Sequence, residues 1–464
     1  MATLTTGGSN RRSFLRRGPS GVDRFAIAAM EGLAARAAAA RDGERDRVRS
    51  GGYGALREVV RSDAVSGREQ TMWLPEGFDF AVFSAAGSAM RDGGSVPASH
   101  GGMACFPTGR RGEWRLVRGH GERGRPGAGS PSGSPEGRYD ALGAGGTTTL
   151  GIVWRDGEPH FEEAWQSLSG VVGSGAGGPT PWGSWLAAEA TCAGTGAGWG
   201  AAHGYVFEVP SAEDGEAEAL PLKSMGRFAH GDVAVDPRSG TVYLAEDQPT
   251  AGCYRFVPEV PGDLAEGGRL QMLKVAGEWN VDTRVNQRPE RGVYVEWVDV
   301  AEPDPAAAED DPLAVFNQGW ARGAAVFGRL TGCFYADGAV YLAAVSGGDE
   351  GEGQLWEYRP RGHGGGTLKL VFESPDASLL SFPQGMAVSP GGSLILCEDT
   401  GRGLPALRGM TREGEVFAFA KVAGGDLGGA VFSPDGKVLF ANLWGADDPG
   451  RTVAIWGPWS AGAL

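Results

Sequence analysis

One local pattern constrains the fold of this chain most: a short apolar run, a tight turn rich in Pro, Asp and Gly, and a second apolar run. Four segments carry it, with starts 100, 53 and 44 residues apart: 235–244, 335–342, 388–396 and 432–440. Pro and Asp start such turns and Gly supplies the positive φ, so the flanking runs pair as antiparallel strands. Repeated hairpins indicate radially packed blades, and the longest interval allows a further blade or an insertion.

The composition agrees with a turn-rich all-β fold. Of the 464 residues 80 are Gly, well above the roughly 7% that is usual in proteins. We therefore predict one large all-β domain, a β-propeller, with a β-sandwich as the alternative. Residues 118–135, rich in Gly, Ser and Pro, are expected to form an exposed loop.

Charge and cysteine spacing disfavour several classes of protein. The net charge of -15 and the pI near 5.0 repel nucleic acid and anionic membranes. The five Cys residues show no Cys-x-x-Cys spacing, which argues against a zinc ribbon. No apolar run of about 18 residues occurs, so no transmembrane helix is expected.

The first 50 residues are assigned to a signal and linker, and residues 51–464 to the propeller. Residues 9–16, Ser-Asn-Arg-Arg-Ser-Phe-Leu-Arg, resemble a twin-arginine export signal, although Asp23, Arg24 and Glu31 interrupt the apolar stretch that should follow. This predicts a periplasmic or secreted protein. The alternatives are a basic N-terminus without a signal function and a cytoplasmic location. Residues 28–49 are expected to form a short helix or a disordered linker.

Longer motifs run along the chain from about residue 50 to the C-terminus. The most specific is Thr-Pro-Trp-Gly-Ser-Trp at 180–185, and others lie at 52–56, 74–78, 102–104, 145–150, 203–209, 226–230, 353–358, 396–399 and 432–436. In this order they resemble the PhoX-type alkaline phosphatase family. The resemblance implies a six-bladed β-propeller with insertions, an iron and calcium cluster, and hydrolysis of phosphomonoesters.

Four positions depart from that family's metal ligands. The resemblance expects Cys at Gly175 and Glu at Ala190, Gly231 and Thr331. A Gly offers no side-chain ligand atom, so the iron and calcium chemistry is in doubt here. Asp232 follows Gly231, but a shift of one residue along a strand turns the side chain to the opposite face, so Asp232 is not expected to replace the missing Glu.

Other acidic and basic positions of the family are kept. The candidate metal ligands, suited to calcium, are Glu189, Glu246, Asp247, Glu398 and Asp399. The candidate catalytic residues, whose planar guanidinium groups can bind two phosphate oxygens each, are Arg329 and Arg408. A structural or solvated role is the alternative for the acids, and a surface ion pair for the arginines. His100 and His230 are expected to be structural.

These residues leave two functions open. The first is a PhoX-like phosphatase that takes a phosphate ester or another small anion, with calcium and the iron that the family implies. The second is a non-catalytic propeller that binds a small anion, calcium or a protein partner. A monomer is expected in both cases.

Overall fold

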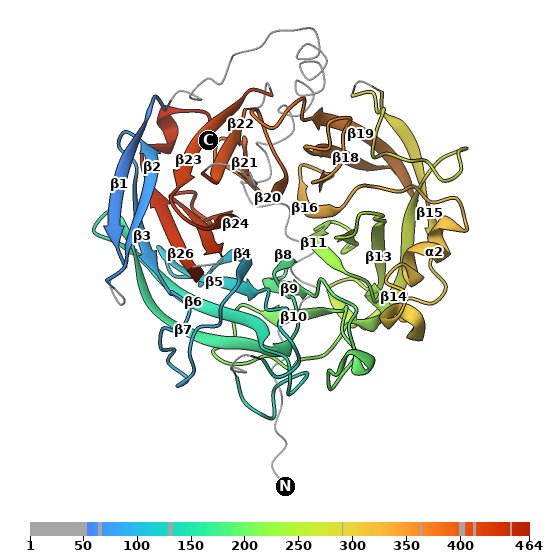
Figure 1. The fold of residues 1–464 in the computed structure, drawn as a ribbon, viewed down its shortest axis with the longest axis horizontal. Helices are drawn as coiled ribbons and strands as arrows, with labels where there is room; N and C mark the ends of the chain where they lie inside the picture. Colours follow the sequence, from blue (N-terminus) through green and yellow to red (C-terminus); the bar gives the residue numbers. More distant parts are fainter. Residues whose placement is uncertain are drawn as a thin grey trace.

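In the computed structural model the chain forms a ring of β-sheets (Figure 1), and residues of the innermost strands line a central channel. The structure describes residues 53–63, 67–128, 133–289, 291–361, 364–398, 404–411, 414–445 and 448–464. The predicted signal and linker at 1–50 lie outside the described residues, and so does Asp399. Among the helices of the described residues, none has the length and apolar character needed to cross a bilayer.

Six groups of strands follow one another around the described part of the ring, each starting with the strand nearest the channel. The first three groups are β4 (His100–Pro107), β5 (Glu113–His120), β6 (Gly145–Arg155) and β7 (Glu158–Val171); β8 (Ala176–Pro179), β9 (Ser184–Ala188) and β10 (Val206–Pro210); and β11 (His230–Val235), β12 (Val242–Glu246), β13 (Cys253–Val260) and β14 (Asp263–Val275). The other three are β16 (Leu330–Ala336), β17 (Ala339–Ala344), β18 (Gln354–Arg361) and β19 (Gly365–Glu373); β20 (Pro383–Val388), β21 (Leu394–Glu398), β22 (Ala406–Met410) and β23 (Val416–Val422); and β24 (Asp426–Phe432), β25 (Val438–Gly445) and β26 (Asp448–Trp456).

The N-terminal strands close the ring. β3 (Asp79–Phe83) pairs with β26 as the outer strand of the last group, while β1 (Leu56–Ser62) and β2 (Glu69–Pro75) extend the fifth group beside β23. The Tyr53 hydroxyl donates a 2.7 Å hydrogen bond to the carbonyl of Trp459, near the C-terminus. Residues from the two ends of the chain therefore hold the fifth and sixth strand groups together.

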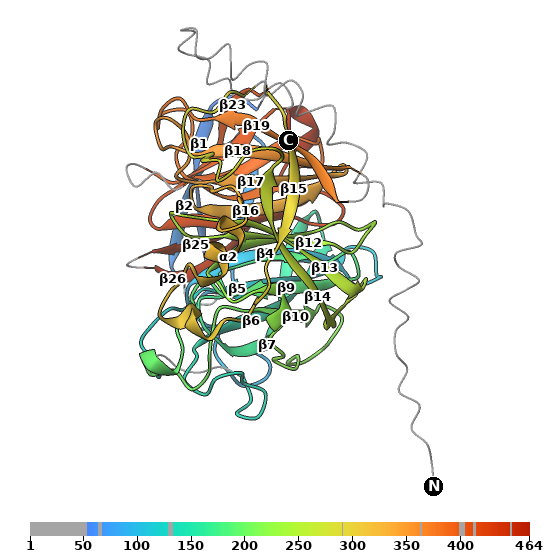
Figure 2. The ribbon, with the colours of Figure 1, turned by 90° about the vertical axis from the view of Figure 1, so that its right-hand side faces the viewer.

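The longest interval between hairpins holds an insertion and no further strand group in its described residues. β15 (Val293–Asp299) bridges β14 and β19, and α2 (Ala314–Trp320) lies at the outer edge beside β14 (Figure 2). The short 3-10 helices are η3 (Thr195–Ala197), η4 (Lys223–Met225), η5 (Ala306–Glu309) and η6 (Trp459–Ala461).

The hairpins expected from the sequence form as antiparallel pairs: β11 with β12, β16 with β17, β20 with β21, and β24 with β25. In the first turn the Arg238 N–H donates to Asp236 Oδ1 at 2.9 Å, and Gly240 has φ 73°. An acid that binds the turn backbone and a Gly with positive φ are what such a turn needs. The all-β propeller prediction is confirmed.

Apolar side chains fill the space between neighbouring strand groups. Ile395 and Phe417 of the fifth group, for example, pack in one cluster with Leu439 and Val453 of the sixth. The expected exposed loop at 118–135 is wrong at its start, because β5 continues to His120 and Arg118 is fully buried.

Candidate functional site

The central channel is a cavity of 1610 Å³. Its walls come from β4, β8, β11, β16, β20 and β24, which contact one another in this order and close the ring. We call the end of the channel at which these inner strands begin the N-end, and the opposite end the C-end. Of the candidate residues that the structure describes, Glu189, Glu246, Asp247, Arg329 and Glu398 lie near the starts of inner strands or the ends of their partner strands, and so belong to the N-end, whereas Arg408 lies within β22.

Bulges interrupt the inner strands near the N-end. The register of β11 against β12 shifts between His230 and Val233, and similar shifts occur in β4, β16, β20 and β24. A bulge adds a residue that the neighbouring strand does not match, so two consecutive residues can face the same side. Gly231 and Asp232 both line the channel. The expectation that Asp232 would turn away from it is therefore wrong.

The four positions that depart from the family pattern lie around this one cavity. Gly175, Ala190, Gly231 and Thr331 all line it. The hydroxyl of Thr331 is buried and has no hydrogen-bond partner among the described residues. The fold thus brings these four distant positions together, but their side chains offer few atoms that could bind a metal ion.

Glycine also lets the strands approach closely at the N-end. A Cβ on Gly231 would lie closer than 3.0 Å to the carbonyl oxygen of Leu330, and one on Gly101 would lie equally close to the carbonyl oxygen of Gly175. Real Cβ atoms essentially never come so near to other atoms. An acidic side chain at either position would therefore require the backbone to move.

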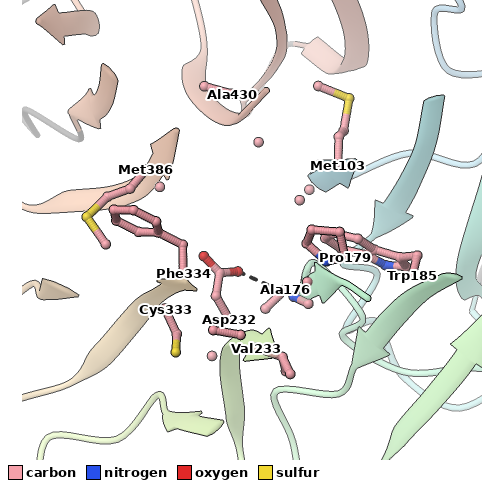
Figure 3. A pocket seen from close by; sticks show the side chains of 18 of the residues that line it. Met103, Ala176, Pro179, Trp185, Asp232, Val233, Cys333, Phe334, Met386 and Ala430 are labelled. Atoms are coloured by element: carbon pink, nitrogen blue, oxygen red, sulfur yellow. Dashed lines mark hydrogen bonds between the residues drawn. The ribbon is translucent and has the colours of Figure 1, made fainter. Parts of the chain in front are cut away.

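Asp232 points into the middle of the channel (Figure 3). Its Oδ1 accepts a 3.3 Å hydrogen bond from the Gly177 N–H, and no ion pair involves it in the described residues. Burial raises the pKa of this carboxyl to about 7, and the nearby Asp247 adds to the rise. Asp232 therefore changes its charge near neutral pH, which a solvated Asp does not do.

Two candidate residues, Asp247 and Arg329, form an ion pair with each other at the N-end. Arg329 Nε donates to Asp247 Oδ1 at 2.7 Å, and Arg123 Nη2 lies 4.0 Å from Asp247 Oδ2. Asp247 and Arg123 line the channel, while the Arg329 side chain is 42% exposed. This rim carries two guanidinium groups around one carboxylate.

Glu189 is fully buried beneath the N-end. One of its oxygens accepts hydrogen bonds from the Val172 N–H and from His203 Nδ1 at 2.6 Å, and the other accepts from the N–H groups of Gly204 and Tyr205. These donors surround the carboxylate, which holds two loops against β9. Its place in the structure is explained without a metal ion.

Glu246 is also turned away from the channel. Its Oε2 accepts from the Gly252 N–H at 2.7 Å and from the Tyr254 hydroxyl at 2.9 Å, while Oε1 has no partner in the described residues. Burial raises the pKa of Glu246 to about 8. The adjacent Asp247 binds Arg329 instead, so the two acids of this pair have separate partners.

Glu398 and Arg408 bind each other across β21 and β22. Arg408 Nε donates to Glu398 Oε2 at 2.8 Å, and Glu398 Oε1 accepts from the Ser381 N–H. Burial raises the pKa of Glu398, although Arg408 opposes the rise. Neither residue lines the channel.

Two buried histidines lie on the channel wall. His100 Nε2 is 3.1 Å from the carbonyl oxygen of Pro97, His230 Nε2 is 3.1 Å from that of Gly204, and each Nδ1 lacks a partner among the described residues. Burial lowers the pKa of both, to about 4 for His230. Both rings are therefore neutral at pH 7, with Nε2 as donor and Nδ1 as an acceptor that faces no protein donor.

The residues described do not fit the expected iron and calcium cluster. No group of three or more His, Cys, Asp or Glu side chains that could hold a metal ion occurs among them. Calcium takes six to eight oxygen ligands, and iron in this family is expected to bind a thiolate. Cys333 lines the channel, and burial raises the pKa of its thiol well above the usual value.

Sequence reasoning missed the channel-facing Asp232 and the apolar wall that includes Phe334 and Met386. A signal was present in the sequence. Several inner strands have near their start a pair of adjacent residues that includes a Gly, such as Gly101-Gly102 and Gly231-Asp232. A Gly inside a strand pattern indicates a bulge.

The chain is similar to known proteins in both sequence and fold. A family model described as "Alkaline phosphatase PhoX" matches residues 157–447. The structure of Pseudomonas fluorescens PhoX in complex with vanadate, a transition state analogue, is similar with a TM-score of 0.66 and 15% identity, over 85% of this chain and 97% of that one. A gluconolactonase from Xanthomonas campestris matches with a TM-score of 0.35 and 12% identity, over 81% and 100% of the chains. No curated protein matches significantly.

Proposed function

The chain belongs to the PhoX alkaline phosphatase family, and we propose that it is a non-catalytic member whose channel binds a small molecule. One observation carries the proposal. Four positions at which the resemblance expects metal ligands carry none, namely Gly175, Ala190, Gly231 and Thr331, and together they line the N-end of the channel.

The chemistry of phosphate-ester hydrolysis explains why this observation matters. Negative charge develops on the phosphoryl group as it transfers, and metal ions neutralise that charge in metal-dependent phosphatases. The backbone contacts of Gly101 and Gly231 leave no room for acidic side chains, so a cluster of the family's kind has no ligands there. A cavity of 1610 Å³ is nevertheless larger than the roughly 300–1,000 Å³ of most ligand pockets, which supports binding of a small molecule.

Phosphomonoester hydrolysis is the second candidate function, and the arginines at the N-end favour it. Arg329 and Arg123 lie on either side of Asp247, so their combined charge exceeds that of the carboxylate. Guanidinium groups bind phosphate oxygens in pairs and could attract an anionic ester to the rim.

Metal content and hydrolysis of 4-nitrophenyl phosphate, measured on one preparation, separate the two functions. The proposal expects far less than one iron per chain and no hydrolysis above a heat-killed control, even with calcium and iron added. Stoichiometric iron together with hydrolysis that Arg329→Ala abolishes would overturn it. Arg238→Ala is the matched control, because Arg238 also pairs through Nε with an Asp, Asp236, but at the C-end.

Two untested properties complete the proposal. We propose that residues 9–16 direct export through the twin-arginine route and that the protein is a monomer. Fractionation of cells expressing the chain with Arg11 and Arg12 intact, or both replaced by Lys, tests the first. Light scattering of the purified protein tests the second.

A further inference from the structure

We propose that the ligand is an organic cation with an apolar body, such as an arylalkyl amine, and that the Asp232 carboxylate binds its ammonium group. The inference rests on the proposed function and names the class of ligand that the channel takes. Asp232 is not among the family's expected ligand positions, and its place in the channel comes from the bulge at the start of β11.

Asp232 differs from Asp247 and Arg238, two other charged groups of the channel, in having no counterion among the described residues. Asp247 has Arg329 and Arg123 at the N-end, and Arg238 has Asp236 at the C-end. Asp232 lies between these pairs and forms no ion pair with the described residues. Asp232 is half-buried in the channel wall. A carboxylate partly withdrawn from water without a counterion is disfavoured, and a cationic ligand would supply the missing charge.

The surroundings of Asp232 suit the body of such a ligand. Met103, Met386, Phe334 and Trp185 line the same cavity (Figure 3). Aromatic faces attract cations through their quadrupole, and Met sulfur is polarisable and adapts to irregular apolar shapes. This wall therefore favours an aromatic or aliphatic body next to the ammonium group.

The overall charge also supports a cation over an anion. An ammonium group is a donor without acceptors, so it matches a carboxylate. The net charge of -15 raises the local concentration of cations.

The test uses three probes with one body and different head groups: 2-phenylethylamine, 2-phenylethanol and 2-phenylethyl phosphate. Their affinities for the full chain are measured by calorimetry at pH 8. The amine is expected to bind at least about tenfold more tightly than the alcohol, and the phosphate most weakly. Asp232→Asn should remove the preference for the amine. Asp156→Asn, at an exposed turn between β6 and β7, should leave it unchanged.

Each other outcome has a defined meaning. Equal affinities for amine and alcohol, or an amine preference that survives in Asp232→Asn, overturn the inference but leave a ligand-binding channel. Tightest binding of the phosphate, lost in Arg329→Ala, overturns the inference and restores the phosphate-ester reading. Failure of all three probes to bind overturns the inference, whereas the proposed function is decided separately by the iron content and the hydrolysis assay. Circular dichroism of both variants verifies that they are folded.

Discussion

The second strands and the inner strands meet at the same end of the channel, yet they carry different chemistry there. Glu189, Glu246 and Glu398 stand at the ends of second strands, and each accepts hydrogen bonds from backbone N–H groups. The inner strands begin with glycines such as Gly231 and with one acid, Asp232, that faces the cavity. The glutamates at the ends of the second strands therefore stabilise the fold, whereas Asp232, near the start of an inner strand, can contact a ligand in the channel.

Glu189→Ala should produce the largest effect in this comparison. Its removal leaves His203 and three backbone N–H groups without their acceptor inside the protein. Breaking a buried charged pair costs about 3–5 kcal/mol, so we expect a loss of that size in the free energy of unfolding. Urea denaturation measures it. An unchanged midpoint would show that the second-strand acids are not structural.

The partner of Glu189 explains why the effect should be large. Burial lowers the pKa of His203, but Glu189 and Asp140 outweigh it and raise the pKa above its ordinary value. His203 contacts one of these acids through each ring nitrogen, at 2.6 and 3.2 Å. Loss of Glu189 thus removes one of the two carboxylates that contact this buried ring.

Arg408→Ala removes the cation that binds Glu398, one of the acids at the ends of the second strands. We expect it to have the next largest effect on the free energy of unfolding. Arg408 is 13% exposed and binds the buried Glu398, whereas Arg329, 42% exposed, binds Asp247 at the rim. A hydrogen bond to a charged group contributes about 1.5–3 kcal/mol when buried, and an exposed ion pair about 0–1 kcal/mol. Denaturation of both Ala variants should show the larger loss for Arg408. A larger loss of stability for Arg329→Ala than for Arg408→Ala would argue against a structural role for Arg408.

The sequence predicts the hairpins well because their causes are local. The turn before β12 needs only Asp236, Gly240 and the apolar runs on either side, all within a few residues. The direction of Asp232 depends instead on how β11 pairs with β12, and strand pairing is not visible in a single run of residues.

The candidate metal site shows the same limit. Glu246-Asp247 resembles a ligand pair in sequence, but the structure gives Glu246 the N–H of Gly252 and gives Asp247 the distant Arg329. A local pattern records which acids are present and does not record which donors the fold brings to them. Positions that carry no ligand atom, such as Gly231, could be recognised from sequence because their side chain is absent whatever the fold.

Glu246→Gln is expected to change the pH dependence of stability. The pKa of Glu246 is raised from 4.5 to about 8 by burial, so the fold favours the neutral carboxyl. This stabilisation is complete below pH 4.5 and is lost as the pH rises through 8. Gln is neutral throughout. Relative to the variant, the wild type should therefore lose stability between pH 5 and pH 9, by more than the roughly 1.4 kcal/mol that a shift of one pKa unit represents. Parallel unfolding curves at both pH values would refute this.

Asp232→Asn should have the smallest effect on stability, and it sharpens the comparison most. An Asn retains an oxygen that can accept the 3.3 Å hydrogen bond from Gly177, and the change removes only the charge. Because burial raises the pKa of Asp232 to about 7, the ionised form is disfavoured by the fold, and the variant should equal or slightly exceed the wild type in stability above pH 7. We expect a difference within about 0.5 kcal/mol at pH 6, as for substitutions that leave packing and hydrogen bonds intact. A loss comparable to that of Glu189→Ala would place Asp232 with the acids that serve the fold, and the distinction between second and inner strands would fail.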